Sequence, residues 1–199
     1  APKPLILEAF VPFVAEVSAI AARAEDGTVA VFDPAENRHA HHILDLSFAP
    51  ARLAPEVAAA ARAHVAAVAS GLELIGLVAL EMFVLPDGRL LGNEIAPRPH
   101  NSGHWTMDAC AASQFEQHIR AVAGLPLASP ERHHDAVMRN LIGPEGMAAW
   151  PRLVATTGVV PHLYGKGAAR PGRKMGHANR LIPLGRLAAM AEDEALHDL

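Results

Sequence analysis

The stretch LVALEMFVLPDGRLLGNEIAPRPHNSGHW, residues 77–105, decides the fold of this chain. Its first part is apolar at nearly every position, which indicates a strand over residues 76–85 that is covered on both faces of a sheet. The Asp87-Gly88 pair is a strong hairpin signal, so we expect the chain to return antiparallel through residues 90–95. The proline-rich remainder gathers charged and polar groups in a loop, where binding residues concentrate on a rigid scaffold. An ordinary polar surface loop is the alternative.

The hairpin predicts a pair of facing carboxylates. If Asp87 and Gly88 form a two-residue loop, Glu81 lies directly opposite Glu94 on one face of the sheet. Facing carboxylates repel, and burial makes the repulsion worse, so a cation between them is the simplest explanation. Oxygen ligands suit a hard ion, and Mg²⁺ bound by one or two carboxylates plus substrate phosphates fits this pattern. Asn93 faces away by strand parity unless a bulge re-aims it. A register shifted by one residue, which would separate the two acids, stays open.

Composition narrows the class of protein. The chain has 199 residues, 51% of them hydrophobic and 19% charged, so a sizeable core is expected and disorder is not. A net charge of −4 argues against a nucleic-acid partner, and no apolar run is long enough to span a membrane. Glu8 interrupts the apolar start, which excludes a signal peptide, and Cys110 stands alone. We therefore expect no nucleic acid, no membrane and a cytoplasmic localisation.

The hydrophobic pattern predicts an α+β chain. Pro55 at a helix start, an alanine-rich interior and Gly71 near the end predict a helix over residues 55–72. Further strands are expected at residues 5–7, 16–23, 29–32, 137–142 and 159–164, and further helices at residues 113–122 and 186–199. The segment 126–130, with two prolines, predicts a boundary before a smaller β-rich unit.

The twelve histidines suggest zinc, because His39, His41 and His42 cluster, as do His133 and His134. Structural zinc sites usually include cysteines at paired spacing, and this chain has one cysteine. A structural zinc site is therefore disfavoured, and metal storage is kept as an alternative.

Two motifs carry a resemblance to a known family. Glu81 followed by residues 93–105 resembles the 5-(carboxyamino)imidazole ribonucleotide synthases, which are ATP-grasp ligases of purine biosynthesis. The Glu…Asn-Glu hairpin is shared among ATP-grasp ligases, whereas the Pro-Arg-x-His-Asn-Ser-Gly-His-Trp continuation is specific to this family. A second family-like motif, RPGRKMGH, covers residues 170–177. The resemblance implies the C-terminal lobe of an ATP-grasp domain, an antiparallel sheet with helices, in residues 1–127. A small β-rich C-terminal domain in residues 128–199 would follow.

The resemblance also implies a reaction and its ligands. The family uses ATP and bicarbonate to carboxylate the amine of aminoimidazole ribonucleotide, with carboxyphosphate as the intermediate and ADP and phosphate as products. By resemblance Glu81 and Glu94, together with Asn93, hold Mg²⁺ against the ATP phosphates. The nucleotide is implied to contact Glu8, Ala9, Phe10 and Val11 at the adenine, Glu16 at the ribose, and His39. The resemblance also implies that the full-length proteins of this family form homodimers.

The anion-handling residues follow from the same two motifs. Arg98 and His100 are implied as catalytic residues beside bicarbonate or carboxyphosphate, where a guanidinium suits a planar anion. The alternative is a structural arginine–carboxylate pair with a solvated histidine. Arg170, Arg173 and Lys174 lie in the stretch 166–180, which has no acidic residue, and a Pro-Gly turn can place them around a substrate phosphate. A solvated basic loop is the alternative there.

The resemblance covers nearly all of this chain but only about the second half of the family's chain. The glycine-rich loop and the lysine-bearing lobe that close over ATP have no counterpart here, so we expect an incomplete fragment with little ligase activity alone. Another ATP-grasp ligase, such as a formate-using one, stays open. So does a catalytically silent half-domain that binds nucleotide or a partner chain, which a large exposed apolar patch would favour.

Overall fold

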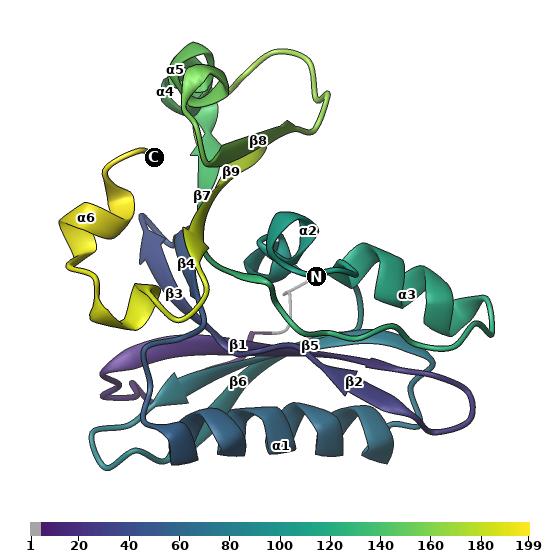
Figure 1. The fold of residues 1–199 in the computed structure, drawn as a ribbon. Coiled ribbons are helices and arrows are strands. Elements are labelled where there is room, and N and C mark those ends of the chain that lie inside the picture. Colours follow the sequence, from purple (N-terminus) through teal and green to yellow (C-terminus); the bar gives the residue numbers. More distant parts are fainter. Residues whose placement is uncertain (1–4) are drawn as a thin grey trace.

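Antiparallel pairing joins nine strands into one sheet in the computed structural model, which describes residues 5–199 (Figure 1). The strands are β1 (Ala15–Arg23), β2 (Val29–Val31), β3 (Ala35–Ala40), β4 (Ile43–Ala49), β5 (Gly76–Val84), β6 (Leu90–Ala96), β7 (His134–Ile142), β8 (Val159–Leu163) and β9 (Lys174–Pro183). Their order is β6-β5-β1-β3-β4-β7-β9-β8, and β2 pairs with the end of β1. The predicted α+β class is confirmed.

Helices cover both faces of this sheet (Figure 1). They are α1 (Pro55–Gly71), α2 (Thr106–Ala109), α3 (Gln114–Val122), α4 (Gly143–Ala148), α5 (Trp150–Ala155) and α6 (Glu192–Leu196), with short 3₁₀ turns η1 (Asn101–Gly103) and η2 (Leu187–Ala189). None of the helices within residues 5–199 is long and apolar enough to cross a membrane.

The helix α1 packs on the face of β1 and β5 opposite to α2 and α3 (Figure 1). Pro55 lies in its first turn, where a missing N–H costs nothing, and the fully buried Ala61, Val65 and Ala69 recur at helical spacing. This buried stripe contacts apolar residues of β1 and β5, including Val78. The predicted helix over residues 55–72 is confirmed to within one residue.

The opposite face of the sheet buries Trp105, directly after the polar loop that follows β6. Its ring meets Phe32 edge to face, with centroids 6.3 Å apart. Replacing a buried tryptophan of this kind by alanine typically costs about 3–5 kcal/mol. The large apolar anchor therefore fixes the end of a loop whose remaining side chains are polar.

The C-terminal strands and helices form a third apolar cluster that continues the same sheet. Phe48 on β4, Val137 on β7 and Ile182 on β9 pack with Leu153 of α5 and Leu199. Because β4 pairs with β7, the strands that precede and follow the segment 126–130 in the sequence belong to one continuous sheet. The division into residues 1–127 and 128–199 stays a prediction.

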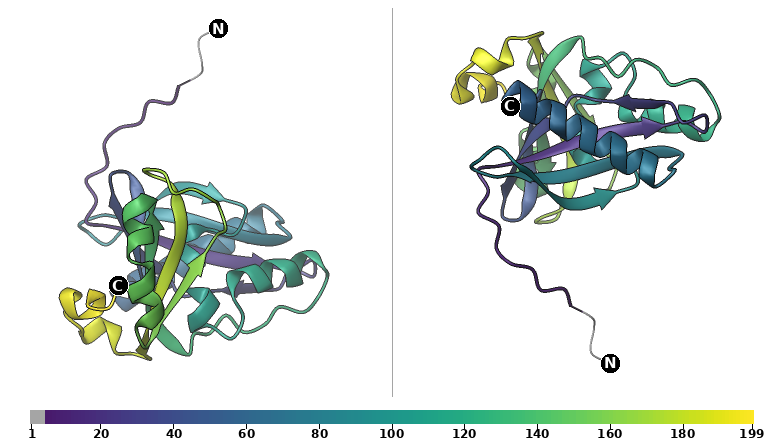
Figure 2. Two further views of the ribbon diagram at one scale, coloured as in Figure 1. Left: turned by 90° about the horizontal axis from the view of Figure 1, so that it is seen from above. Right: turned by 90° about the horizontal axis from the view of Figure 1, so that it is seen from below.

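Two predictions about the elements are wrong, and three strands were not predicted. Residues 5–7 form no strand: their side chains are exposed, and the segment leads away from the sheet (Figure 2). A segment of three residues buries too little apolar surface to form a stable strand when it pairs with no other strand of residues 5–199. The tail forms η2 and α6 rather than one helix over 186–199. The strands β3, β4 and β9 were not predicted, because β3 and β9 carry polar residues and glycine of low strand propensity.

The turn between β3 and β4 holds two non-glycine residues in the left-handed region. His41 has φ 51° and His42 has φ 63°, while Ala40 pairs with Ile43. A two-residue hairpin loop with positive φ at both positions favours asparagine and glycine. For other residues the left-handed conformation costs on the order of 1–2 kcal/mol.

We predict that His42→Gly raises the free energy of unfolding by about 0.5–1 kcal/mol, since the relieved strain exceeds the extra backbone entropy of glycine. Urea unfolding followed by circular dichroism measures it. Ala40→Gly, within β3, is the control and lowers the same free energy. A destabilised His42→Gly protein would contradict the strain.

Candidate active site

A cavity of about 520 Å³ opens where β3, β4, the β5–β6 hairpin, the loop after β6 and the start of β9 converge. Six of the residues predicted from the sequence line it: His39, Glu81, Glu94, Arg98, His100 and Lys174. His42, Ile43, Leu44, Asn101, Lys166 and Gly172 complete the lining. The cavity thus joins acidic groups of one hairpin to basic groups from two distant parts of the chain.

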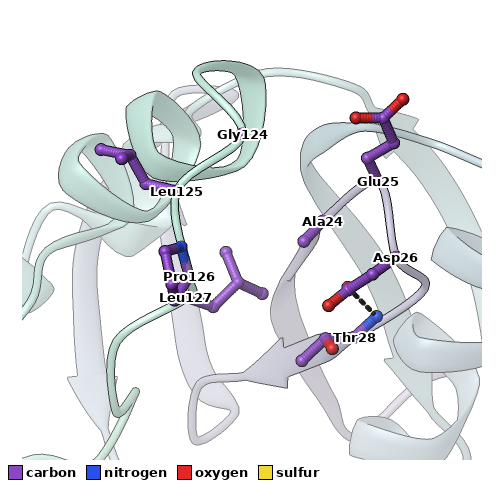
Figure 3. Close-up of a pocket in the computed structure, with 8 residues that line it drawn as sticks. All are labelled: Ala24, Glu25, Asp26, Thr28, Gly124, Leu125, Pro126 and Leu127. Atoms are coloured by element: carbon purple, nitrogen blue, oxygen red, sulfur yellow. Dashed lines mark hydrogen bonds between the residues drawn. The ribbon is translucent and has the colours of Figure 1, made fainter.

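A second hollow of about 520 Å³ lies between the β1–β2 turn and the segment after α3 (Figure 3). Its lining carries Glu25 and Asp26 but no basic side chain, and Asp26 accepts the Thr28 N–H at 2.9 Å. A hollow of this kind offers nothing to neutralise a phosphate. The cavity that contains Glu81 is therefore the candidate site.

The facing carboxylates are present, although the turn that was expected to place them is different. The Leu85 N–H donates to the Arg89 carbonyl at 2.9 Å, so the loop has three residues, ending with Gly88 at φ 82°. The predicted two-residue loop is wrong. Glu81 nevertheless pairs with Glu94, as predicted, because Asn93 is an extra residue in a bulge between that pair and the next one, Met82 with Gly92.

The environment of Glu81 suits a cation. Burial and then the nearby Glu94 raise the pKa of Glu81 above its ordinary value. No group of three or more His, Cys, Asp or Glu side chains in the described part of the chain is placed to hold a metal. The protein would thus supply two carboxylates, leaving other positions to phosphate and water oxygens, which is how proteins commonly bind Mg²⁺. Asn93 lies outside the cavity lining, and its metal role stays a prediction.

His100 is held as a neutral donor toward this acidic pair. Burial, followed by Arg98 and Lys174, lowers its pKa to about 4. The Ser102 N–H points at Nδ1 over 3.4 Å, and the Ser102 hydroxyl lies 2.8 Å from the same nitrogen. With Nδ1 accepting, the hydrogen is on Nε2, which lies 3.5 Å from a Glu81 oxygen.

The basic side of the cavity comes from the loop after β6 and from the loop before β9. Arg98 donates to the Pro99 carbonyl at 3.1 Å and has no carboxylate partner among residues 5–199, so the alternative of a structural ion pair is not supported. Burial lowers the pKa of Lys174, while Glu81 acts in the opposite direction. Neither Arg98 nor Lys174 forms an ion pair with a carboxylate among residues 5–199, so both side chains are available to an anion in the cavity.

The predicted Pro-Gly turn is present before β9. The Arg173 N–H donates to the Arg170 carbonyl at 3.0 Å, and Gly172 has φ 72°. Lys174 and Lys166 line the cavity, whereas Arg170 and Arg173 lie outside the lining on the same loop. The substrate-phosphate role of these two arginines stays a prediction.

The residues predicted to contact the nucleotide lie in two separate places. Glu16 and His39 form a pair, with Oε2 2.9 Å from Nδ1 across β1 and β3. Phe10 and Val11 instead line a separate hollow of about 450 Å³ along the β5–β6 turn, and Glu8 and Ala9 are exposed. The structure does not bring residues 8–11 into the cavity, so their adenine contacts stay predictions.

Three polar or charged lining residues were not assigned a role from the sequence: His42, Asn101 and Lys166. The acid-free stretch 166–180 contained a signal for Lys166. Asn101 exchanges amide hydrogen bonds of 3.0 and 2.9 Å with Asn140 of β7. No local sequence signal reports a pair thirty-nine residues apart.

Comparison with known proteins identifies the family to which this site belongs. The model of the ATP-grasp domain matches residues 1–115, more than half of the chain. The chain belongs to the ATP-grasp family. The model of the phosphoribosylaminoimidazole carboxylase C-terminal domain matches residues 136–183.

Several relatives of this ATP-grasp chain are named N5-carboxyaminoimidazole ribonucleotide synthase. An N5-carboxyaminoimidazole ribonucleotide synthase of Brucella melitensis biotype 1 is 54% identical over 180 residues, which cover 90% of this chain and 49% of the relative. The crystal structure of an ADP complex of N5-carboxyaminoimidazole ribonucleotide synthetase has a TM-score of 0.85 at 45% identity, covering 90% of this chain and 48% of that one. A synthase from Aspergillus clavatus, in complex with ADP and 5-aminoimidazole ribonucleotide, has a TM-score of 0.81 at 34% identity, covering 87% and 48%.

These similarities confirm the resemblance and the fold predicted from the sequence. The chain spans about half the length of the curated relatives it matches. The activity of those whole enzymes is therefore only proposed for this ATP-grasp chain.

A stack of three histidines around the buried His177 joins the loop after β6 to β8 and β9. The ring of His177 lies between His104 and His162, with centroid distances of 4.8 and 4.6 Å. Burial is the largest cause that lowers the pKa of His104 to about 4 and that of His177 to about 2. Both rings are neutral in the folded ATP-grasp chain at neutral pH.

We predict that the ATP-grasp chain loses stability as the pH falls below about 6.5, because His100, His104 and His177 then gain protons only in the unfolded state. Three such groups give a slope of up to about 4 kcal/mol per pH unit between the unfolded and folded pKa values. The raised pKa of Glu81 opposes this loss at the acid end. Urea unfolding at a series of pH values measures the slope.

His177→Phe is expected to flatten this slope by about a third, since it removes one of the three groups. The control is His197→Gln, whose side chain is 80% exposed and which leaves the slope unchanged. Equal slopes in the wild-type and His177→Phe proteins would contradict the prediction.

Proposed function

We propose that this ATP-grasp chain carries the metal, bicarbonate and ribonucleotide side of the active site of a 5-(carboxyamino)imidazole ribonucleotide synthase. The reaction is the ATP- and bicarbonate-dependent carboxylation of 5-aminoimidazole ribonucleotide in purine biosynthesis. One observation carries the proposal: Glu81 and Glu94 face each other in the same cavity as Arg98, His100 and Lys174. The names of the similar proteins and the ligands of the Aspergillus clavatus complex support it.

The acidic side of the cavity suits the phosphates of ATP with Mg²⁺. Glu81 and Glu94, with Asn93, would hold the ion, which neutralises charge on the phosphates when it is bound. The pair of Glu16 and His39 lies beside these carboxylates and suits the ribose and the adjoining part of the nucleotide. The backbone of residues 8–11 would meet the adenine.

The basic side of the cavity suits the carboxylation. Bicarbonate oxygen attacks the γ-phosphorus of ATP and releases ADP. The substrate amine then attacks the carboxyl carbon of the carboxyphosphate so formed, the C–O bond to phosphate breaks, and the proton lost from the amine leaves with the phosphate. Arg98 would bind the planar anion, and the Nε2–H of His100 would donate to it, because both groups lack a carboxylate hydrogen-bond partner closer than 3.5 Å. Lys174, with Arg170 and Arg173, would bind the ribonucleotide phosphate.

Localisation, assembly and the division of the chain belong to the same proposal. The enzyme acts in the cytoplasm on small molecules and forms a homodimer, with residues 1–127 as the ATP-grasp lobe and residues 128–199 as the small C-terminal domain. Since the chain covers half of its relatives, ligand binding tests the proposal more directly than turnover does.

We predict that the chain binds Mg²⁺·ADP and that Glu81→Gln and Glu94→Gln each weaken the affinity about tenfold or more, because a lost charged contact costs about 1.5–3 kcal/mol. Isothermal titration calorimetry with and without Mg²⁺ measures the effect. Glu116→Gln is the control, because Glu116 lies on α3 and pairs with Arg120. Affinities that do not depend on Glu81, or no binding by the wild-type chain, would contradict the proposal.

A second candidate function, a half-domain that binds a partner chain, is favoured by the outer face of α3. Phe115, Ile119 and Val122 recur at helical spacing and are 38%, 60% and 52% exposed. The buried face of the same helix is formed by Gln114, Gln117 and Ala121. An apolar stripe that faces solvent is the pattern of an interaction surface, and the homodimer proposal makes a second copy its occupant.

We predict that the wild-type chain self-associates with increasing concentration and that Ile119→Ser shifts it toward monomer, because the substitution removes the most exposed apolar side chain of α3. Sedimentation velocity measures the distribution. Val154→Ser on α5, 56% exposed and away from this helix, is the matched control. A wild-type chain that stays monomeric at every concentration would rule this face out as a self-association surface.

A further inference from the structure

The fully buried side chain of Gln114 is bound to the loop that carries Arg98 and His100. Its Oε1 accepts the His100 N–H at 2.9 Å, and its Nε2 donates to the His100 carbonyl at 2.7 Å. The same Nε2 lies 2.9 Å from Nδ1 of His104. One amide thus binds the backbone of His100 as a neighbouring strand would, and it reaches the next histidine as well.

These three contacts use the hydrogen-bonding capacity of the amide in only one orientation. Reversing the amide would place its NH₂ group against the His100 N–H and its oxygen against the His100 carbonyl, so both pairs would repel. With Nε2 as the donor, Nδ1 of His104 must accept, and its hydrogen is on the other ring nitrogen. Burial lowers the pKa of His104 to about 4, which agrees with a neutral ring in this state.

The loop around this amide leaves no room for another arrangement. A Cβ atom at Gly103 would lie 2.7 Å from Oε1 of Gln114 and 2.3 Å from Cδ1 of Ile20. The Gln114 N–H donates to the Thr106 hydroxyl at 2.9 Å, and that hydroxyl donates to the Gly103 carbonyl at 2.6 Å. Backbone and side chain of Gln114 therefore hold residues 100–106 together.

We propose that Gln114 is a positioning residue, whose amide fixes His100 and His104 and so sets how the loop presents Arg98 and His100 to the cavity. The inference rests on the proposed function for the roles of Arg98 and His100. The contacts themselves can be tested in the chain without any ligand.

The chain also contains a matched control. Gln117 lies one turn further along α3, is equally buried, and binds the backbone of Ala128 in the same way, with bonds of 2.6 and 3.1 Å. Gln117 and Ala128 are both outside the cavity lining. Gln114→Glu and Gln117→Glu are therefore the same chemical change at equally buried positions. The first removes contacts to the backbone of His100, and the second removes contacts to the backbone of Ala128.

The experiment is ¹⁵N nuclear magnetic resonance of the histidine-labelled chain at neutral pH. The wild-type spectrum is expected to show His104 neutral with the hydrogen on Nε2. In Gln114→Glu a carboxylate replaces the donor, so Nδ1 of His104 gains a hydrogen, the His100 ring signals shift, and exchange of the His100 amide rises about tenfold. Gln117→Glu leaves these signals as in the wild type.

Gln114→Met, which keeps the length but cannot hydrogen-bond, is the second variant if the glutamate variant does not fold. It is expected to give a mixture of the two His104 tautomers. Wild-type signals of His100 and His104 in either folded variant, or equal changes in Gln117→Glu, would overturn the proposal. Absence of Mg²⁺·ADP binding by the wild-type chain would contradict the proposed function and leave this measurement unaffected.

Discussion

The pairing of Glu81 with Glu94 across β5 and β6 is the constraint on which the site depends. Facing carboxylates are unfavourable, and burial together with the nearby Glu94 raises the pKa of Glu81. Under the proposed function, a bound cation would relieve this repulsion. The helices on both faces and the buried strand β5 hold the two backbones in register, so that the repulsion cannot be relieved by slippage.

The loop after β6 gains its rigidity from neutral groups and not from ion pairs. Trp105 anchors one end in the core, and Gln114 binds the backbone near the other end. This division leaves the charge of Arg98 and the Nε2–H of His100 free toward the cavity. A loop held by salt bridges to its own arginine could not present that arginine to an anion.

Much of the site could be predicted from the sequence, though partly for an inaccurate reason. The register of Glu81 and Glu94 came out right because two errors cancelled: the loop is one residue longer than expected, and the bulge at Asn93 restores the pairing. Turn length and bulges depend on backbone geometry that hydrophobic alternation does not report. For the same reason β3 was not predicted, since its polar residues are strand-forming only through partners such as the Asn37–Ser47 and Glu36–Arg52 contacts. Those partners lie on other segments, and no local pattern reveals them.

The pKa shifts in the cavity share a cause and point to how ligands would bind. Burial pushes Glu81 toward its protonated form and Lys174 toward its neutral form, and it keeps His100 uncharged. A cation beside Glu81 reverses the first shift, and an anion beside Lys174 reverses the second. Since each ligand also attracts the other, a metal–phosphate pair is favoured over either ion alone, and the coupling is reciprocal. Under the proposed function, a cavity that disfavours its own charges would thereby favour a ligand that brings both signs together.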